Sequence, residues 1–476
     1  MINITVTRLA TGIFVLSFTA DAAAQIDIHQ FLDSRYAETE RIAKALWDYA
    51  EVGYQEEMSS TLLQNTLSAE GFEIEAGVAG IPTAFVASYG GGGPVIAILA
   101  EYDALPGITQ DATPTRNPVE NKGAAHACGH NLFGAGSVSA AIAVKHWLDE
   151  TGTQGTIRLY GTPAEEGGSG KTYMVRDGLF DDVDIALHWH ASGFNTAAAL
   201  TSLANRSAKF RFHGLSQHAA RAPEKARSAL DGVEVFNYMI NLMREHVPQQ
   251  TRIHYVITSG GLAPNVVPDF AEVYYYVRHP DATVVSEIWV RLEEAAMGAA
   301  QGTGTQVDWE IIHGTHSLVV NETLATMMDE KLREVGGIKY TPEEQAFAEQ
   351  IFATLESPAY ELGSQESIDP YEVSLGYAST DVGDVSIVVP TVGLRIATWV
   401  PGTTSHSWQA AAASGMSIGF KGANNAAKTL SLAAIELFEN DELRAAARAE
   451  HREKLGDDFH YEPLLGDRAP PLDYRN

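Results

Sequence analysis

The sequence predicts an α/β protein whose mainly parallel sheet is interrupted by a smaller α+β module. Runs rich in β-forming residues alternate with helical runs between about residues 95 and 192, which is typical of parallel strands joined by crossover helices. Near residue 205 the runs begin to alternate apolar and polar residues, and the α/β pattern returns after about residue 312. A chain of 476 residues also exceeds the size at which one hydrophobic core stops growing, so we expect more than one domain.

The first predicted elements lie on either side of a glycine run. Apolar residues at helical spacing predict a helix across residues 26–53. The segment TAFVASYGGGGPVIAILAEYDALPG contains two β-rich runs joined by four glycines, which predicts a hairpin. Within it, residues 96–100 are all apolar, as in a strand that is buried on both faces.

The next elements carry the α/β alternation. A helix rich in small residues, FGAGSVSAAIAVKHWLDE, is followed by the strand GTIRLYG, the helix KTYMVRDGLF and the strand VDIALHWHAS. After the inserted module, the strand TVGLRIATWV and the long helix SGMSIGFKGANNAAKTLSLAAIELFEN continue the pattern. These elements predict a sheet covered by helices.

The inserted α+β module is expected over residues 205–312. It is predicted from the strand SAKFRFHG, the helix RSALDGVEVFNYMINLMREHV, the alternating strands RIHYVITSGG and FAEVYYYVRHP, and a helix at about 283–300. The main domain then comprises residues 25–204 and 313–440. Residues 441–476 are expected to form a C-terminal extension on the surface.

The N-terminus and the net charge narrow the location and the partners. Residues 1–24 resemble a secretory signal, with Arg8, an apolar stretch and three alanines before Gln25, which predicts a periplasmic or secreted protein, or a cytoplasmic one if the segment is not removed. The formal net charge of −29 argues against nucleic acid or an anionic membrane surface as a partner. Small molecules and metal cations are better candidates.

Metal-binding residue types follow the predicted strands, where α/β enzymes place their sites. Taken singly, a cysteine is more often a buried packing residue, and a histidine is more often hydrogen-bonded than a ligand. Four separate loops with such residues favour a metal site, and two adjacent glutamates suit a dinuclear one, in which one binds metal while the other accepts a proton from water. The residues are Cys128, His130, Glu165, Glu166, His188, His190 and His406.

A different class of function is suggested by GGSGKT at residues 167–172. The segment follows a strand and opens a helix, as a phosphate-binding loop does, and would make the chain a nucleotide-binding protein. That loop requires glycine five positions before Gly170, where this sequence has Glu165, whose carboxylate would repel phosphate. A non-catalytic metal-binding module is a third alternative.

Six segments together resemble the dinuclear metallopeptidase family M20, which includes aminoacylases and glutamate carboxypeptidases, and particularly its amidohydrolase branch. The resemblance spans about residues 35–440 and implies a zinc-exopeptidase-like catalytic domain that holds two divalent metal ions, Zn or Mn. It also makes the inserted module a lid through which the protein forms a homodimer, with a second type of subunit as a further partner. The segments are HACGHNLFGAGS, GTPAEEGGSGKTYM, DVDIALHWH, GLSQHAARAPEKARSALDGVE, GGLAPNVVPDFAEVYYYVR and PGTTSHSW.

The resemblance also implies roles for single residues at the metal site. Glu165 is the general base and acid, and His190 is preferred to His188 as a ligand for its spacing from Asp184, although the two could exchange roles. Glu101 stands where many members outside this branch have a histidine ligand, so Asp103 is expected to orient a ligand rather than to bind metal. The implied ligands are Cys128, His130, Glu166, His190 and His406.

Three residues of the module are implied to act on the substrate. His218 matches a lid histidine that reaches across the dimer to stabilise the oxyanion. Asn265 matches a substrate-contacting asparagine, and Arg278 could pair with a substrate carboxylate or form a structural salt bridge.

The resemblance implies a metal-dependent amidohydrolase. Its substrate would be an amide between an acyl or aminobenzoyl group and an amino acid with a free carboxylate. The same residues could instead act on a dipeptide or on an N-acyl amino acid.

Overall fold

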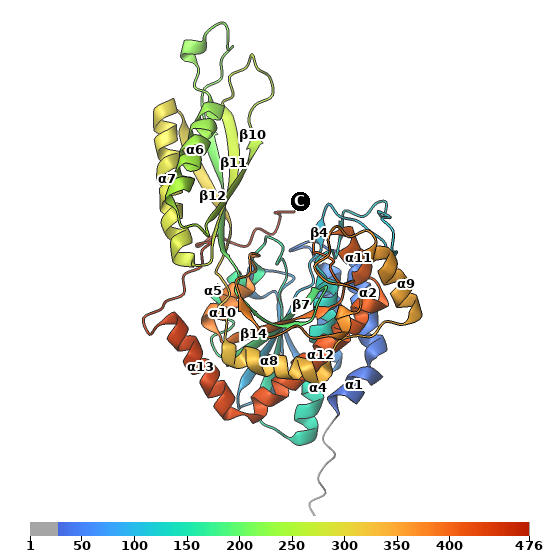
Figure 1. Cartoon of the computed structure of the whole chain (residues 1–476). Helices are drawn as coiled ribbons and strands as arrows, with labels where there is room; N and C mark the ends of the chain where they lie inside the picture. Colours follow the sequence, from blue (N-terminus) through green and yellow to red (C-terminus); the bar gives the residue numbers. More distant parts are fainter. Residues whose placement is uncertain (1–26, 476) are drawn as a thin grey trace, which may run out of the picture.

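An eight-stranded mixed sheet forms the centre of the main domain in the computed structural model, which describes residues 27–475 (Figure 1). The predicted signal segment, residues 1–24, lies outside the described residues. Four neighbouring central strands, β6, β3, β7 and β14, are mutually parallel, which confirms the predicted α/β class. In spatial order the strands are β1 (Glu73–Ala76), β2 (Phe85–Gly91), β6 (Gly155–Gly161), β3 (Val95–Ala100), β7 (Ile185–Ser192), β14 (Thr391–Ala397), β8 (Thr196–Leu200) and β13 (Val373–Ser374).

The predicted hairpin between β2 and β3 is wrong. β6 lies between them, antiparallel to β2 and parallel to β3, and its backbone uses the hydrogen-bonding edges of both strands. The glycines join β2 and β3 across the start of β6, and a Cβ atom on Gly93 would lie 2.5 Å from the Gln154 carbonyl oxygen. The run is therefore needed for close backbone approach rather than for a two-strand turn.

Two long helices cover the central strands. α4 and α12 pack on each other, and both contact β3 and β7, so the small residues expected in α4 lie at a crowded interface. The helix predicted over residues 26–53 is two helices, α1 and α2, which meet at Arg35. The helices of this domain are α1 (Ile28–Ser34), α2 (Tyr36–Tyr49), α3 (Glu57–Ala69), α4 (His130–Thr151), α5 (Gly170–Arg176), α8 (Glu322–Val335), α9 (Pro342–Phe352), α10 (Val382–Val388), α11 (Trp408–Ser414), α12 (Ser417–Glu439) and α13 (Asp441–Leu455). A two-stranded ribbon, β4 (Leu105–Pro106) with β5 (Ala124–Ala125), completes it.

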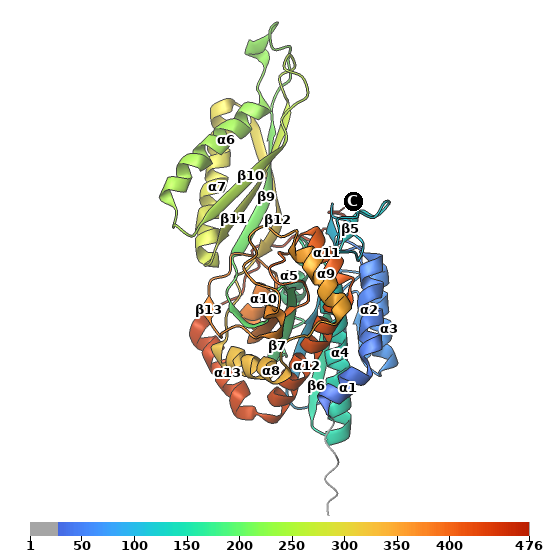
Figure 2. The same cartoon turned by 45° about the vertical axis from the view of Figure 1, so that its right-hand side comes forward.

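The inserted module is a separate layer pair that projects from the main domain (Figures 1 and 2). Its antiparallel sheet has the order β10, β11, β9, β12, and two helices cover one face over a core of its own, which includes Phe210, Phe236 and Trp289. The elements are β9 (Ala204–His213), α6 (Ala229–Met243), β10 (Arg252–Ser259), β11 (Phe270–His279), α7 (Ala282–Thr303) and β12 (Gln306–Thr315). β12 was not predicted, because its apolar and polar residues alternate weakly.

The C-terminal segment begins with α13 and then returns to the sheet. The Tyr474 hydroxyl donates a hydrogen bond of 3.1 Å to the Glu166 backbone carbonyl, and the Arg475 guanidinium contacts the same oxygen. The segment predicted to be a surface extension therefore ends against the loop after β6. Within residues 27–475, the helices are all too short or too polar to cross a membrane.

Candidate metal centre

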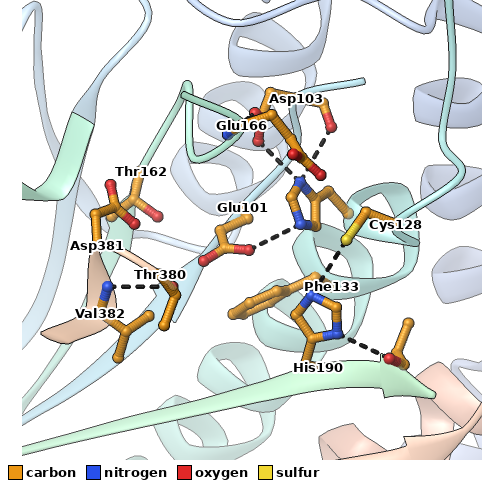
Figure 3. Close-up of polar contacts among 12 residues, drawn as sticks. Glu101, Asp103, Cys128, Phe133, Thr162, Glu166, His190, Thr380, Asp381 and Val382 are labelled. Atoms are coloured by element: carbon orange, nitrogen blue, oxygen red, sulfur yellow. Dashed lines mark hydrogen bonds and ion pairs between the residues drawn. The ribbon is translucent and has the colours of Figure 1, made fainter. Parts of the chain in front are cut away.

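The metal-binding residue types lie where the parallel strands end. The loops after β3, β6, β7 and β14 and the start of α4 meet at one edge of the sheet, because the carboxyl ends of parallel strands share that edge. Figure 3 shows Glu101, Cys128, Glu166 and His190 converging on one space. Residues separated by almost three hundred positions are thus brought together by strand order alone.

The predicted ligands fall into two groups that share Cys128. In each group the donor atoms lie within 4.8 Å of one another: Cys128, His130 and His190 form one, and Cys128, Glu166 and His406 form the other. Glu101, His130 and Glu165 make a third group at the same spacing. Thiolate, imidazole and carboxylate donors in two overlapping groups fit two divalent ions.

Asp103 holds two of these residues in place. One of its carboxylate oxygens lies 2.9 Å from Nδ1 of His130, and the other accepts the backbone N–H of Glu166 at 2.9 Å. Because a carboxylate only accepts hydrogen bonds here, Nδ1 of His130 carries the proton and Nε2 has a free lone pair. The interaction with His130 opposes the effect of burial and holds the pKa of Asp103 at about 2.

His190 is oriented in the same way. Its Nδ1 donates to the backbone carbonyl of Ala191 at 2.8 Å, and its Nε2 lies 3.5 Å from the sulfur of Cys128. Burial, together with the charge of Arg395, lowers the pKa of His190 well below its usual value. The ring is therefore neutral, which is the form that binds a metal ion.

Three buried atoms at the centre make no hydrogen bond within the described residues. They are Oε2 of Glu101, Nε2 of His130 and Oε1 of Glu166. Buried polar atoms are nearly always satisfied, and the binding of an ion is one of the few ordinary reasons for an exception. Three such atoms from separate segments, all facing one space, fit metal ligands better than packing residues.

The loop after β6 presents the two glutamates. Both Glu165 and Glu166 lie in a turn, preceded by Ala164 with φ of 58°, so their side chains are not forced to opposite faces as in a strand. Burial, and then the nearby charge of Glu101, raises the pKa of Glu165 well above its usual value. A carboxyl group with a raised pKa can take up and return a proton near neutral pH.

His406 completes the second group from the loop after β14. Its backbone adopts a left-handed conformation with φ of 60°, and its N–H donates to the carbonyl of Ala127 at 2.9 Å. The ring nitrogen Nε2 lies 3.1 Å from Oε1 of Glu166. A left-handed conformation at a histidine costs energy and is found mainly where function requires it.

Lys171 occupies a buried position beside this centre. Its ammonium lies 2.7 Å from Glu101 and 2.8 Å from Asp381, and all three side chains are buried. A lysine that is enclosed and neutralised in this way cannot hold a nucleotide phosphate. The geometry therefore disfavours the phosphate-loop interpretation of GGSGKT.

His188 lies outside all three groups. Its ring packs over Gly393 on the neighbouring strand β14, where a Cβ atom would come within 2.2 Å of it. Burial, with contributions from Lys171 and Arg395, lowers the pKa of His188 to about 3. Of the two histidines on β7, only His190 lies near Cys128, and its role as a ligand stays a prediction.

The substrate residues predicted on the inserted module do not reach the metal groups of the same chain. The exposed His218 and Asn265 lie in adjoining loops, joined by a hydrogen bond from the N–H of Ala219 to the carbonyl of Asn265 at 3.0 Å. The loop after β9, which carries His218, lies at the end of the module remote from the sheet (Figure 2). Arg278 is on β11, with its guanidinium 5.3 Å from the ring centre of Tyr276.

Sequence reasoning did not identify Lys171, Asp381 or Arg395 as part of this region. A signal was present for the last, because Arg395 is the one charged residue in the otherwise apolar segment TVGLRIATWV. A cation within a buried strand needs a partner or a function. The Lys171 contacts depend on α5 and α10 meeting in space, which no local pattern encodes.

The fold and the donor groups define a dinuclear-type metallohydrolase, and the comparisons agree. The model of Peptidase family M20/M25/M40 matches residues 97–372, and the chain belongs to this family. One of the subunits of p-aminobenzoyl-glutamate hydrolase from Escherichia coli is 40% identical over 93% of this chain and 99% of its own length.

Two further relatives extend the comparison. The Xaa-Arg dipeptidase of Mus musculus is 28% identical, with 87% of this chain and 89% of the dipeptidase covered. The crystal structure of a dinuclear metal-binding peptidase of the M20 family from Bacillus subtilis shares the fold, with a TM-score of 0.59 and 17% identity over 86% of this chain and 99% of that one. The protein is a metal-dependent hydrolase of amide bonds, as predicted.

Proposed function

We propose that the protein hydrolyses the amide bond between an aminobenzoyl group and glutamate or a similar amino acid. The observation that carries the proposal is the pair of donor groups sharing Cys128, with Glu165 beside them in the same space. The name of the Escherichia coli relative supports the choice of acyl group and amino acid.

The chemistry follows from the donor set. When bound, two divalent ions would supply Lewis acidity and a water of lowered pKa. Glu165, whose carboxyl has a raised pKa, takes a proton from the attacking water and passes it to the departing amine. Asp103 keeps His130 and the Glu166 backbone fixed while this happens. Zn is favoured by the thiolate and Mn by the carboxylates, so we propose either ion.

Metal analysis and hydrolysis assays on wild type and the Glu165→Gln variant test the proposal. We expect both proteins to hold metal, and we expect wild type alone to release p-aminobenzoate from p-aminobenzoyl-glutamate. General acid–base catalysis contributes about 10²- to 10⁴-fold, so the loss should be at least about 100-fold. Equal turnover in the two proteins would remove Glu165 from the mechanism.

A dipeptidase activity is the second candidate, supported by the similarity to the Xaa-Arg dipeptidase. Peptides ending in arginine and N-acetyl amino acids should therefore be assayed beside p-aminobenzoyl-glutamate. The substrate with the highest kcat/KM decides between the two candidates.

We also propose that the inserted module forms a homodimer and that His218 acts on the partner's centre. Large apolar side chains are exposed on α6 and on the edge strand β10, which supports a second copy of the chain as the occupant. They are Val235, Tyr238, Met239, Leu242, Tyr255, Val256 and Ile257.

Two further proposals concern the partner and the location of the protein. The name of the Escherichia coli relative makes it one of two differently named subunits of its hydrolase, so a second type of subunit is an additional proposed partner. Export through residues 1–24 to the periplasm or outside the cell remains our proposal for the location.

A further inference from the structure

A cavity of about 340 Å³ opens beside the metal groups. Glu101, Cys128, Glu165 and His190 form one side of it, so a molecule in the cavity would lie against the proposed reaction centre. The opposite walls are mainly apolar and aromatic. They include Phe133, Phe194, Leu200, Leu318, Val382 and Leu394.

Arg395 is the only arginine or lysine that lines this cavity, among the described residues. It is the register partner of His190 on the neighbouring parallel strand, as β14 pairs with β7. Residues at matched positions of a sheet project from the same face. The guanidinium therefore lies next to the His190 ring, on the side of the sheet that bears the metal groups.

The Arg395 guanidinium has no counterion in the part of the chain that is described. No carboxylate oxygen of residues 27–475 lies within 4.0 Å of it, and its side chain makes no hydrogen bond and packs on no aromatic ring there. Arg158, by contrast, is paired with Asp182 at 2.6 Å, and Arg278 packs on Tyr276. Burial lowers the pKa of Arg395, but a guanidinium remains protonated in proteins.

An unpaired cation in an apolar cavity is costly unless an anion enters. We propose that Arg395 binds a carboxylate of the substrate's amino-acid half and thereby selects acidic amides. The inference rests on the proposed function, in which the amino acid carries the carboxylates and the aminobenzoyl group carries none. A guanidinium can hold a carboxylate through two parallel hydrogen bonds, which would also fix the amide relative to Glu165.

Three substrates and two arginine variants test this proposal. The substrates are p-aminobenzoyl-glutamate, which has both carboxylates, p-aminobenzoyl-glutamine, which lacks the side-chain carboxylate, and p-aminobenzoyl-isoglutamine, which lacks the α-carboxylate. The variants are Arg395→Met, of similar length without the charge, and Arg278→Met as the matched control on the inserted module. Metal content and melting temperature are measured for each protein, so that a folding defect is detected.

We expect Arg395→Met to lower kcat/KM for p-aminobenzoyl-glutamate by about 10- to 100-fold, the value of a hydrogen bond to a charged group, with metal content unchanged. One of the two carboxamides should lose a similar factor with wild type and little more with Arg395→Met, because the contact is already absent. Arg395→Lys should recover part of the loss.

Two results would overturn the assignment. An equal fall for all three substrates, or a fall in metal content, would mean that Arg395 acts on Cys128 or on the ions rather than on the substrate. A loss confined to Arg278→Met would place the carboxylate anchor on the inserted module.

If wild type hydrolyses none of the three compounds, the proposed function fails. Calorimetric binding of the same compounds to wild type and Arg395→Met then judges Arg395 separately. Weaker binding of the diacid alone to the variant supports the anion site, and equal binding to both proteins rejects it.

Discussion

The ammonium of Lys171 lies 2.7 Å from a carboxylate oxygen of Glu101, and both side chains are buried. Asp381 contacts the same ammonium, and Glu101 in turn lies 3.1 Å from Nε2 of His130. A structural charge network therefore continues directly into the metal centre (Figure 3). The lysine of the GGSGKT segment balances two carboxylates rather than the phosphates of a nucleotide.

Replacing Lys171 with methionine should strongly destabilise the protein. The change leaves Glu101 and Asp381 buried without their cation, and breaking a buried pair in this way costs about 3–5 kcal/mol of unfolding free energy. Urea unfolding of the metal-free protein measures the change. Lys44→Met, which removes an exposed pair with Asp48 at 3.4 Å, is the control and should cost less than about 1 kcal/mol. Similar midpoints for the two variants would contradict the role given to the buried network.

Gly393→Ala should displace the His188 ring. The added Cβ would meet the ring at 2.2 Å, and neighbouring strands leave no room for the backbone to retreat. Overpacking of this kind costs about 1–3 kcal/mol, so the melting temperature should fall. The double variant Gly393→Ala with His188→Ala should recover much of the loss, because the smaller side chain vacates the space. No rescue would mean that the strain lies elsewhere.

Metal binding should depend more on Cys128 than on His406. Cys128 belongs to both groups that share it, whereas His406 belongs to one. We expect Cys128→Ala to lose metal at both positions and His406→Ala to keep about one ion per chain, because three donors of the other group remain. Elemental analysis after dialysis gives the metal content. Full occupancy in Cys128→Ala would show that the thiol is a packing residue after all.

A chelator should lower the melting temperature of wild type. Ligands that bind only the folded state stabilise it, by about 2.7 kcal/mol at a concentration one hundred times Kd. The buried atoms without hydrogen bonds, Oε2 of Glu101 and Nε2 of His130 among them, lose their partners when the ions leave. Thermal unfolding with and without the chelator measures the shift, and Cys128→Ala should show a smaller one. An unchanged melting temperature in wild type would argue against structural coupling between ions and fold.

Mixing two inactive variants should restore activity if His218 serves the partner's centre. A dimer of one His218→Ala chain and one Glu165→Gln chain has one site with both residues intact, so random exchange gives about a quarter of wild-type turnover. The control mixes His218→Ala with a chain that carries both substitutions, which has no intact site in any pairing. Absence of recovery in the first mixture, with dimers present by light scattering, would refute action across the dimer.

Local patterns predicted most elements of the main sheet but not their neighbours. β2, β3 and β6 each have a readable run of β-forming residues, yet the glycine run between β2 and β3 indicated a hairpin that does not form. Pairing is a choice among strand edges that the whole sheet makes, and a short linker does not decide it. The break at Arg35 was missed for a related reason, because apolar spacing continues through it while the backbone turns.

The sequence by itself determined which chemistry was available: a cysteine, histidines and paired glutamates placed after strands, with a family resemblance that assigned their roles. Only the tertiary structure decided which of them meet, since His190 and His188 differ by two positions and share a face, yet one lies near Cys128 and the other over Gly393. It also placed Arg395 beside a cavity without a counterion and brought Tyr474 back to the loop after β6. The physical reason is that residue type is a local property, whereas the distance between two side chains depends on strand order and packing across the whole chain.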